Sequence, residues 1–302
     1  MFKQEIDFIG KRKIALIVSS ILIVVSLASL AIKGLEQGID FTGGTLVEVG
    51  YAEAVELPPI RESLRKAGFG EATIQHFGTA KEVLIRLKTQ EGVSNADIST
   101  QILKIAGGTL RRVEFVGPQV GEELATDGGL AMLYSVFGIL IYVAWRFEYK
   151  FALGSVAALI HDVIITLGFF SVFSLEFDLT VLAAILAVIG YSLNDTIVVY
   201  DRIRENFRRL RKGAATEILN ISLNQTLSRT LMTSLTTMLV LVALATLGGQ
   251  IIQNFAIALM VGVVVGTYSS IFIASPLVLA LGISKEDLML PEKEGADVDI
   301  HP

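Results

Sequence analysis

Residues 179–206 read LTVLAAILAVIGYSLNDTIVVYDRIREN, and this stretch decides the class of fold. Its first part, 179–199, contains a single charged residue, Asp195. A helix needs about 20 mostly apolar residues to cross the hydrocarbon of a bilayer. The stretch is therefore predicted to be a transmembrane helix that carries a carboxylate in its second half.

Five further stretches of the chain have the same character. The chain has 302 residues, of which 52% are hydrophobic and 18% are charged, against about 25% charged in an ordinary soluble domain. For the first span a cleaved signal peptide is the alternative, but its apolar stretch is long for one and five spans follow, so we favour a retained anchor. The six predicted spans are 14–32, 129–145, 151–173, 179–199, 230–247 and 255–281, the last ending near Pro276.

The distribution of lysine and arginine predicts the orientation. Four basic residues precede the first span, two separate the second from the third, six follow the fourth, and the short loops at 174–178 and 248–254 carry none. Short loops rich in Lys and Arg mark the cytoplasmic side, so we expect both termini to be cytoplasmic. The expected parts are an N-terminal segment with the first helix (1–35), an extracytoplasmic domain (36–127), a five-helix remainder of the bundle (128–282) and an acidic cytoplasmic tail (283–302).

The segment between the first two spans has the pattern of a small α+β domain. Strands are predicted at 45–51, 73–77, 83–87 and 110–116, and helices at 58–67 and 95–105. The order β-α-β-β-α-β is that of a ferredoxin-like sandwich. The expected fold class is thus an α-helical membrane protein with six transmembrane helices and one extracytoplasmic ferredoxin-like domain between the first and second.

Several classes of function find no support in the sequence. The net charge of -5 offers no basic field for nucleic acid, and the chain has no cysteine. The three histidines, His76, His161 and His301, are too far apart in sequence for a metal-binding motif. A phosphate-binding loop and a nucleophile elbow are also missing from the sequence. We therefore expect no enzyme activity, no cofactor, no metal and no nucleic-acid partner.

Two charged residues at matched depth are the main candidates for function. Asp195 lies in the inner half of the fourth span, and Arg229 lies at the inner edge of the fifth. Arg229 alone is equally well explained as a cation that reaches the interface. For Asp195 alone, a structural group bonded to neighbouring helices is the less favoured alternative. Together they favour an ion pair whose contact changes when the carboxylate binds a proton, because a persistent charge in hydrocarbon is costly.

Three further residues belong to the predicted ion relay. Asn194 is part of a small, hydrogen-bonding helix surface around Asp195. Asp162, beside His161, lies near the middle of the third span and is either a second relay point or a group hydrogen-bonded to the adjacent helix.

In the last span Gly262 and Gly266 form a GxxxG pair, which indicates close helix packing within the chain or with a partner.

Three sequence blocks together resemble a known family. They are GIDFTGGT at 38–45, GYSLNDTIVVYDRIREN at 190–206 and NQTLSRT at 224–230. With the six spans and the single outside domain, the chain resembles the SecF members of the SecD/SecF family of bacterial protein-export membrane proteins, which is related to the resistance-nodulation-division transporters. The resemblance covers nearly the whole chain.

The resemblance implies a function that the residues alone do not. It implies a subunit of the bacterial inner membrane that uses a proton or sodium gradient to promote late translocation, with the family's membrane aspartate and arginine falling on Asp195 and Arg229. The implied partners are SecD, which carries its own membrane aspartate, the SecYEG channel, YajC, the translocating preprotein and membrane lipid. The alternatives are a small-molecule or lipid exporter on the same bundle and a structural scaffold of the channel.

Overall fold

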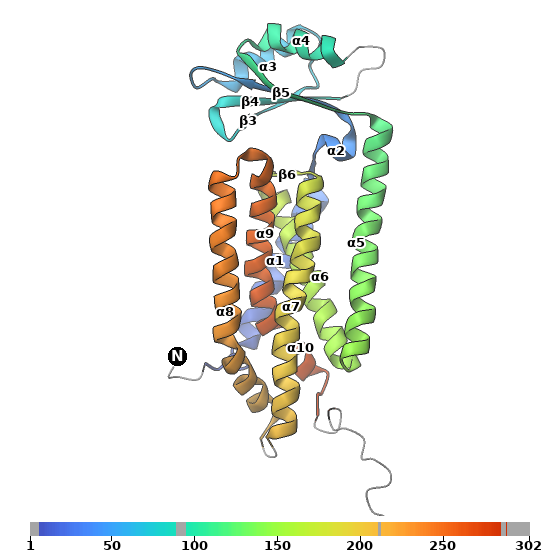
Figure 1. The fold of residues 1–302 in the computed structure, drawn as a ribbon, viewed down its shortest axis with the longest axis vertical. Coiled ribbons are helices and arrows are strands. Elements are labelled where there is room, and N and C mark those ends of the chain that lie inside the picture. The colour runs from blue at the N-terminus through green and yellow to red at the C-terminus, as the bar shows by residue number, and fades with distance from the viewer. Residues whose placement is uncertain (1–5, 89–94, 211–212, 285–287, 289–302) are drawn as a thin grey trace, which may run out of the picture.

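The computed structural model describes residues 6–88, 95–210, 213–284 and 288. A bundle of long helices stands beneath a small α+β domain (Figure 1). The acidic tail predicted from residue 283 onward lies almost entirely outside the described residues.

Six helices in the described part of the chain are long and apolar enough to cross a membrane, as predicted. Two of them run far past the predicted spans, because polar, helix-forming residues continue the α7 and α8 helices at the end away from the α+β domain (Figure 1). The helices are α1 (Arg12–Ile32), α5 (Pro118–Arg146), α6 (Tyr149–Phe173), α7 (Leu179–Arg209), α8 (Ala215–Leu247) and α9 (Gln250–Ser269).

The last span does not end near Pro276, so that prediction is wrong. A five-residue π-helix, η1 (Ser270–Ala274), follows α9, and α10 (Ser275–Ala280) continues the span. Pro276 is the second residue of α10, which directly follows the π-helical turn. Because the helix runs on from α9, the missing N–H of Pro276 interrupts the backbone hydrogen bonds at this point. Single π-helical turns inside α-helices occur frequently at functional sites.

The domain above the bundle has the predicted order of elements. Its four-stranded antiparallel sheet has the order β3-β4-β2-β5, and α3 and α4 cover the face that points away from the bundle (Figure 1). Alternating residues of the strands, such as Val47 and Ile85, pack against these helices. The elements are β2 (Gly44–Gly50), α3 (Leu57–Lys66), β3 (Thr73–Phe77), β4 (Thr79–Leu87), α4 (Asn95–Ala106) and β5 (Thr109–Val116).

Three short elements that the sequence did not reveal join this domain to the bundle. They are β1 (Glu36–Gln37), α2 (Ile39–Thr42) and β6 (Glu176–Phe177), and β1 pairs with β6 in parallel. Residues 118–127, the last part of the predicted outside domain, form the first turns of the continuous helix α5.

A buried ion pair fixes the sheet to this joint. Arg86 on β4 donates to a carboxylate oxygen of Glu176 at 2.5 Å and to the backbone oxygen of Gln37 at 3.1 Å. The side chains of Arg86 and Glu176 are each 15% exposed. Burial raises the pKa of Glu176, and the Arg86 charge opposes that shift only in part.

The stability of the chain is expected to fall as the pH rises through the raised pKa of Glu176. Glu176 keeps its proton in the folded state at pH values where an unfolded glutamate has lost it, so its favourable contribution is complete only below the ordinary glutamate pKa. Melting temperatures between about pH 5 and pH 8 test this. The excess stability of the wild type over Glu176→Gln should shrink with rising pH, whereas a constant difference would contradict the assignment. Glu114→Gln, at an exposed side chain, serves as the control.

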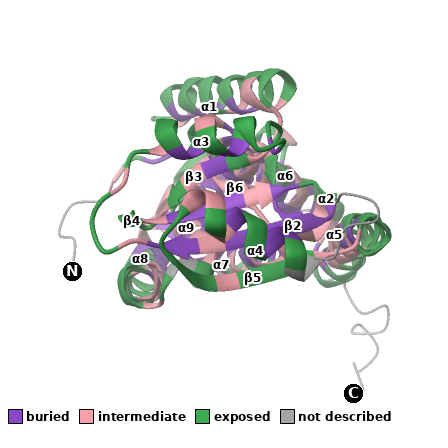
Figure 2. Cartoon of the chain, turned by 90° about the horizontal axis from the view of Figure 1, so that it is seen from above, coloured by how far each residue is buried: buried purple, intermediate pink, exposed green. Residues whose placement is uncertain are grey.

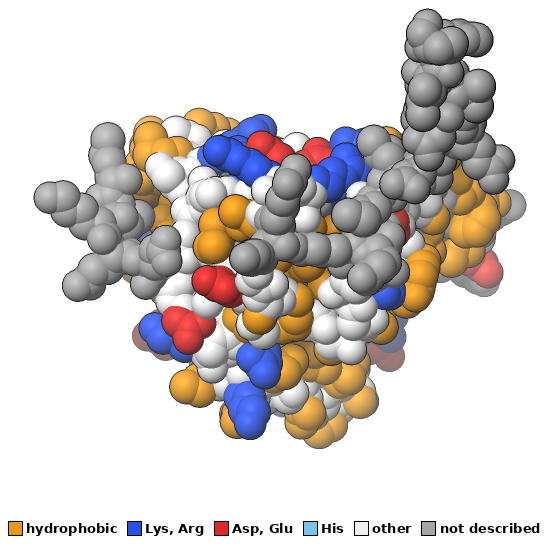
Figure 3. All heavy atoms as spheres, turned by 90° about the horizontal axis from the view of Figure 1, so that it is seen from below, with side chains coloured by type: hydrophobic (Ala, Val, Ile, Leu, Met, Phe, Trp, Pro, Cys, Tyr) orange, Lys and Arg blue, Asp and Glu red, His pale blue; other side chains and the backbone are white. Residues whose placement is uncertain are grey.

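The centre of the bundle is α7, and the periphery is apolar and exposed. Large hydrophobic side chains on α1, α5 and α8 are exposed. Figure 2 shows these three helices at the edge of the molecule, coloured largely as exposed. Such surfaces suit lipid or a membrane partner. At the end of the bundle away from the α+β domain, by contrast, basic and acidic side chains lie side by side (Figure 3). Two of their ion pairs join α7 to the α5–α6 region, Arg146 with Asp201 and Arg204 with Glu148, both at 3.1 Å.

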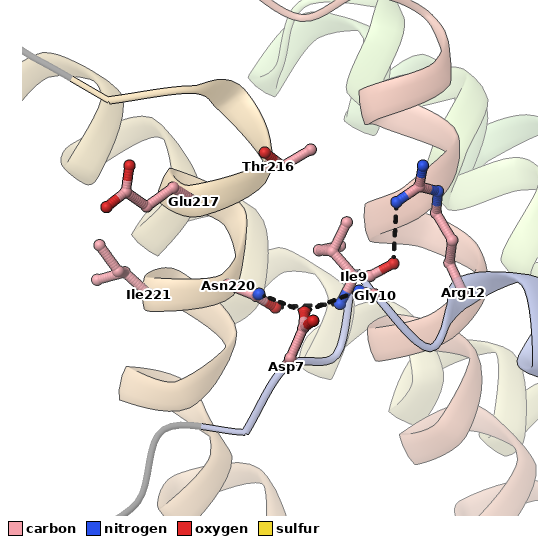
Figure 4. Close-up of a pocket in the computed structure, with 8 residues that line it drawn as sticks. All are labelled: Asp7, Ile9, Gly10, Arg12, Thr216, Glu217, Asn220 and Ile221. Atoms are coloured by element: carbon pink, nitrogen blue, oxygen red, sulfur yellow. Dashed lines mark hydrogen bonds between the residues drawn. The ribbon is translucent and has the colours of Figure 1, made fainter.

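The N-terminal stretch is held on α8 by two asparagines. Asn224 donates to the backbone oxygen of Ile6 and accepts from its backbone N–H. Asn220 accepts from two backbone N–H groups of the same stretch and donates to Asp7 at 2.6 Å (Figure 4). These contacts tie the start of α1 to the inner part of α8.

Candidate functional site

Asp195 lies inside the bundle and joins three helices. It is 7% exposed. Thr230 Oγ1 on α8 donates a 2.6 Å hydrogen bond to Oδ1, and Ser270 Oγ on η1 donates one of 2.6 Å to Oδ2. Both carboxylate oxygens are therefore satisfied by hydroxyl groups from different helices, as a buried charge requires.

The hydroxyl partners of Asp195 suit both protonation states. A hydroxyl group donates one hydrogen bond and can accept others. Ser270 Oγ also lies 3.0 Å from the backbone oxygen of Thr267. When Asp195 is protonated, Ser270 can turn its proton to Thr267 and accept from the carboxyl group, so proton binding needs no unpaired buried group.

Asp162 forms a second buried carboxylate site on α6. It is 1% exposed, and its Oδ1 lies 2.9 Å from Nδ1 of His161. Its Oδ2 accepts from Ser192 Oγ on α7 at 2.5 Å and from Ser269 Oγ on α9 at 2.8 Å. Asp162 thus forms the hydrogen bonds to adjacent helices that the sequence offered as one alternative, and it also contacts His161. Its role as a second relay point stays a prediction.

The two carboxylate sites are neighbours through α9 and η1. Ser269, the last residue of α9, donates to Asp162, and Ser270, the first residue of η1, donates to Asp195. Consecutive helical residues point about 100° apart, so the two serines face α6 and α7 respectively. On α7 itself, Ser192 and Asp195 are separated by about 4.5 Å along the helix axis.

The GxxxG pair packs inside this chain. A Cβ atom on Gly266 would lie 3.0 Å from the Cβ of Ser192, and one on Gly262 would collide with Val188. The two glycines therefore let α9 approach α7 closely. This approach brings Ser192 and Ser269 to the same carboxylate.

The expected direct ion pair between Asp195 and Arg229 is not formed in the described structure. Arg229 is exposed and has no carboxylate within 4.0 Å among the described residues. Thr230, the next residue, points at Asp195 instead. Because one residue turns a helix by about 100°, Arg229 must point away when Thr230 points inward. Matched depth alone therefore did not imply contact, although the Arg229 charge remains within electrostatic range of Asp195.

Asn194 is likewise exposed, on a face of α7 that is formed by small residues. The residues one to three turns before it on this face, Ala183, Ala187 and Gly190, are also exposed and small. A face of small residues allows another helix to approach closely in a membrane. Asn194 and Arg229 thus lie on surfaces that this chain leaves uncovered.

Two residues of the block at 224–230 have a structural role that the sequence did not reveal. Asn224 holds the N-terminal stretch, and Gln225 accepts from the amide of Asn206 at 2.9 Å. Sequence reasoning also missed Thr230, Ser269 and Ser270 as carboxylate partners. The signal that could have found them is the accumulation of hydroxyl residues in apolar spans, but serine and threonine at these positions also satisfy their own helix backbone.

Comparison with known proteins places the chain in a family. Residues 99–284 match the model of the protein-export membrane protein SecD/SecF, C-terminal, and residues 28–55 match the SecD/SecF GG motif. The chain is 53% identical to the protein translocase subunit SecF of Vibrio alginolyticus, with 99% of this chain and 98% of that protein covered. It is 49% identical to the SecF subunit of Pseudomonas aeruginosa, with 98% of each covered.

Solved structures show the same architecture. A crystal structure of SecDF, a translocon-associated membrane protein from Thermus thermophilus, matches with a TM-score of 0.86 at 40% identity and covers 92% of this chain. A crystal structure of SecDF in a super-membrane-facing form matches with a TM-score of 0.69, also at 40% identity. Since the sequence identity is the same, the lower TM-score reflects a different arrangement of the matched chain. This chain spans 39% of the length of each SecDF chain. With the full-length SecF relatives and the two matched sequence regions, these findings establish that the chain belongs to the SecD/SecF family of protein-export membrane proteins.

Proposed function

We propose that the chain is the SecF-type subunit of an ion-gradient-driven protein-export machine in the bacterial inner membrane. With SecD it uses a proton or sodium gradient to promote the late movement of a preprotein through SecYEG on the outer side. Its termini are cytoplasmic, its domain at 36–127 is extracytoplasmic, and it catalyses no covalent chemistry. YajC and membrane lipid are further partners in this proposal.

The observation that carries the proposal is the placement of Asp195. A carboxylate at 7% exposure, held by hydroxyls from α8 and η1, can bind and release a proton while its neighbours only rotate hydroxyl groups. Each change alters the hydrogen bonds that join α7 to α8 and to the last span. Ion occupancy can therefore shift the bundle between two packings.

The position of Arg229 supports a site that is shared with a second membrane half. Arg229 and Asn194 are exposed in this chain, and a guanidinium facing lipid would be costly. This chain spans 39% of the matched SecDF chain, so most of that protein lies outside the matched part. We infer that SecD covers the face with Ala187, Gly190 and Asn194 and encloses Arg229.

Single cysteines test this inference cleanly, because the chain contains none. Asn194→Cys and Arg229→Cys, each in the complex with SecD, should cross-link to SecD and resist membrane-permeant thiol reagents. Leu239→Cys is the control, since Leu239 lies on an outward face of α8 and is 64% exposed. Equal labelling of all three cysteines would contradict a SecD contact at this face.

A further inference from the structure

A chain of hydrogen bonds leads from the backbone of α1 to the carboxylate of Asp162. The hydroxyl of Tyr268 lies 2.7 Å from the backbone oxygen of Ala15 and 3.0 Å from Ser19 Oγ. Ser19 Oγ lies 3.2 Å from Nε2 of His161, whose Nδ1 faces Asp162 Oδ1 at 2.9 Å. Ser19 and His161 are each 3% exposed, so water does not replace these contacts.

The direction of each hydrogen bond follows from the fixed end of this chain. A backbone oxygen only accepts, so Tyr268 donates its single proton to Ala15 and must accept from Ser19. Ser19 then uses its single hydroxyl proton in the bond to Tyr268, so its oxygen can only accept a hydrogen bond from His161. Nε2 of His161 therefore carries a proton, and only the proton between His161 and Asp162 is free to vary.

The contact between His161 and Asp162 is built to hold one proton. Without a proton on either atom, two lone pairs would face each other at 2.9 Å in a buried site. With it, the pair is electrically neutral, whether the proton sits on Nδ1 or on Oδ1. The second oxygen, Oδ2, is meanwhile held by the hydroxyls of Ser192 and Ser269.

Asp195 is the other buried carboxylate near this pair, linked to it through the consecutive residues Ser269 and Ser270. Among the described residues, the elements packed on α6 present two titratable groups here, Asp195 on α7 and Tyr268 on α9, while α1 presents Ser19. The α5 and α10 helices carry no charged residue at this depth. Two carboxylates in one low-dielectric region repel when both are ionised.

The two serines at the junction of α9 and η1 can transmit the change of state. Ser269 has a second acceptor, the backbone oxygen of Gly266 at 3.2 Å, just as Ser270 has Thr267 at 3.0 Å. A change at either carboxylate can therefore turn a hydroxyl on one of two consecutive residues. The π-helical turn places those residues on the two different carboxylates.

We propose that His161 and Asp162 form a second proton-binding site, which releases its proton when Asp195 has bound one. This inference rests on the proposed ion coupling at Asp195 and extends it. In the step, Asp195 takes up a proton and becomes neutral, and the His161–Asp162 pair gives its shared proton to water. The pair then carries one negative charge, so the cluster keeps a single net negative charge throughout.

Asp162→Asn separates this role from a structural one. The amide can donate to Nδ1 of His161, and its oxygen can accept from Ser192 and Ser269, so the variant copies the proton-loaded pair and should fold. In the complex with SecD, its gradient-dependent release of a stalled preprotein should fall about tenfold or more. The control is Ser171→Ala, which removes a buried α6–α1 hydroxyl contact, the 2.8 Å bond to Ser29, outside the cluster. It should retain at least half of the wild-type rate.

Nitrogen NMR of histidine-labelled complex gives a readout that does not depend on export. The chain has three histidines, so His161→Asn identifies the His161 signals. We expect Nε2 to stay protonated, and only Nδ1 to change with pH. At the pH where half of the wild-type pairs hold the shared proton, Asp195→Asn should lower the protonated fraction, because the repelling charge is gone.

The outcomes separate the two proposals. Full release by Asp162→Asn, a His161 signal protonated only on Nδ1, or no response of His161 to Asp195→Asn would each overturn the second site. Full release by Asp195→Asn would instead overturn the ion coupling at Asp195. If Asp162→Asn fails to assemble with SecD, the NMR spectra of the wild type and of Asp195→Asn still decide whether His161 and Asp162 form a second proton-binding site.

Discussion

Asp195→Asn is expected to abolish gradient-dependent preprotein release while the chain still folds and binds SecD. Asparagine has nearly the same shape, and Ser270 can turn to the Thr267 oxygen, so the amide is accommodated. It cannot bind a proton. Moving one charge through about 100 mV supplies about 2.3 kcal/mol, which corresponds to roughly a 50-fold change in an equilibrium. The loss should approach that factor.

The measurement is release of a stalled preprotein in vesicles after the ATP-driven motor has stopped, with and without an imposed gradient. Asp201→Asn is the matched control, because Asp201 lies on the same helix but at the inner end, 45% exposed and paired with Arg146. It should change release less than twofold. Equal, modest losses in the two variants would mean that Asp195 acts only in stability.

Gly44→Ala is expected to destabilise the chain more than any other single methyl group added at a glycine of the outside domain. Gly44 has φ of +133°, and its Cβ would collide with the backbone oxygen of Leu87. That oxygen belongs to β4, which pairs with β2, and cannot move without breaking the sheet. Backbone strain and collision together should cost about 2–4 kcal/mol, read as a lower melting temperature and faster proteolysis of the outside domain.

Gly34→Ala isolates the contribution of the backbone angle. Gly34 also has a positive φ, +74°, but a Cβ atom added there would have no other atom within 4 Å. Its replacement should cost only about 1 kcal/mol, the penalty of a left-handed conformation. If both alanine variants lose the same stability, the close approach of β2 to β4 at Gly44 does not explain the glycine pair at 43–44.

Hydrophobic runs predicted where the helices cross the membrane but not how long the helices are. Span prediction measures apolar length, whereas α7 and α8 continue through polar residues that still favour helix. The small sheet β1–β6 could not be predicted, because two-residue strands have no pattern and its partners are 140 residues apart. Alternation over five to nine residues was enough for the strands of the outside domain.

The sequence predicted which charged residues belong to the candidate site, but not which side chains they contact. The rarity of charges in the spans selected Asp195, Arg229 and Asp162, since burial of an unpaired charge is costly wherever it occurs. Which partner each charge meets depends on the rotation of each helix. On α8 that rotation turned Thr230 inward and Arg229 outward.

By itself the sequence determined the six spans, the α+β domain between the first two and the charged residues worth testing, because hydropathy and alternation are local properties. The family resemblance came from the three sequence blocks at 38–45, 190–206 and 224–230. Only the tertiary structure decided that hydroxyl groups surround both carboxylates, that Ser269 and Ser270 join them, and that Arg229 faces outward. These contacts arise between helices distant in sequence, and helix rotation and close packing at Gly262 and Gly266 set them. No local pattern encodes that rotation.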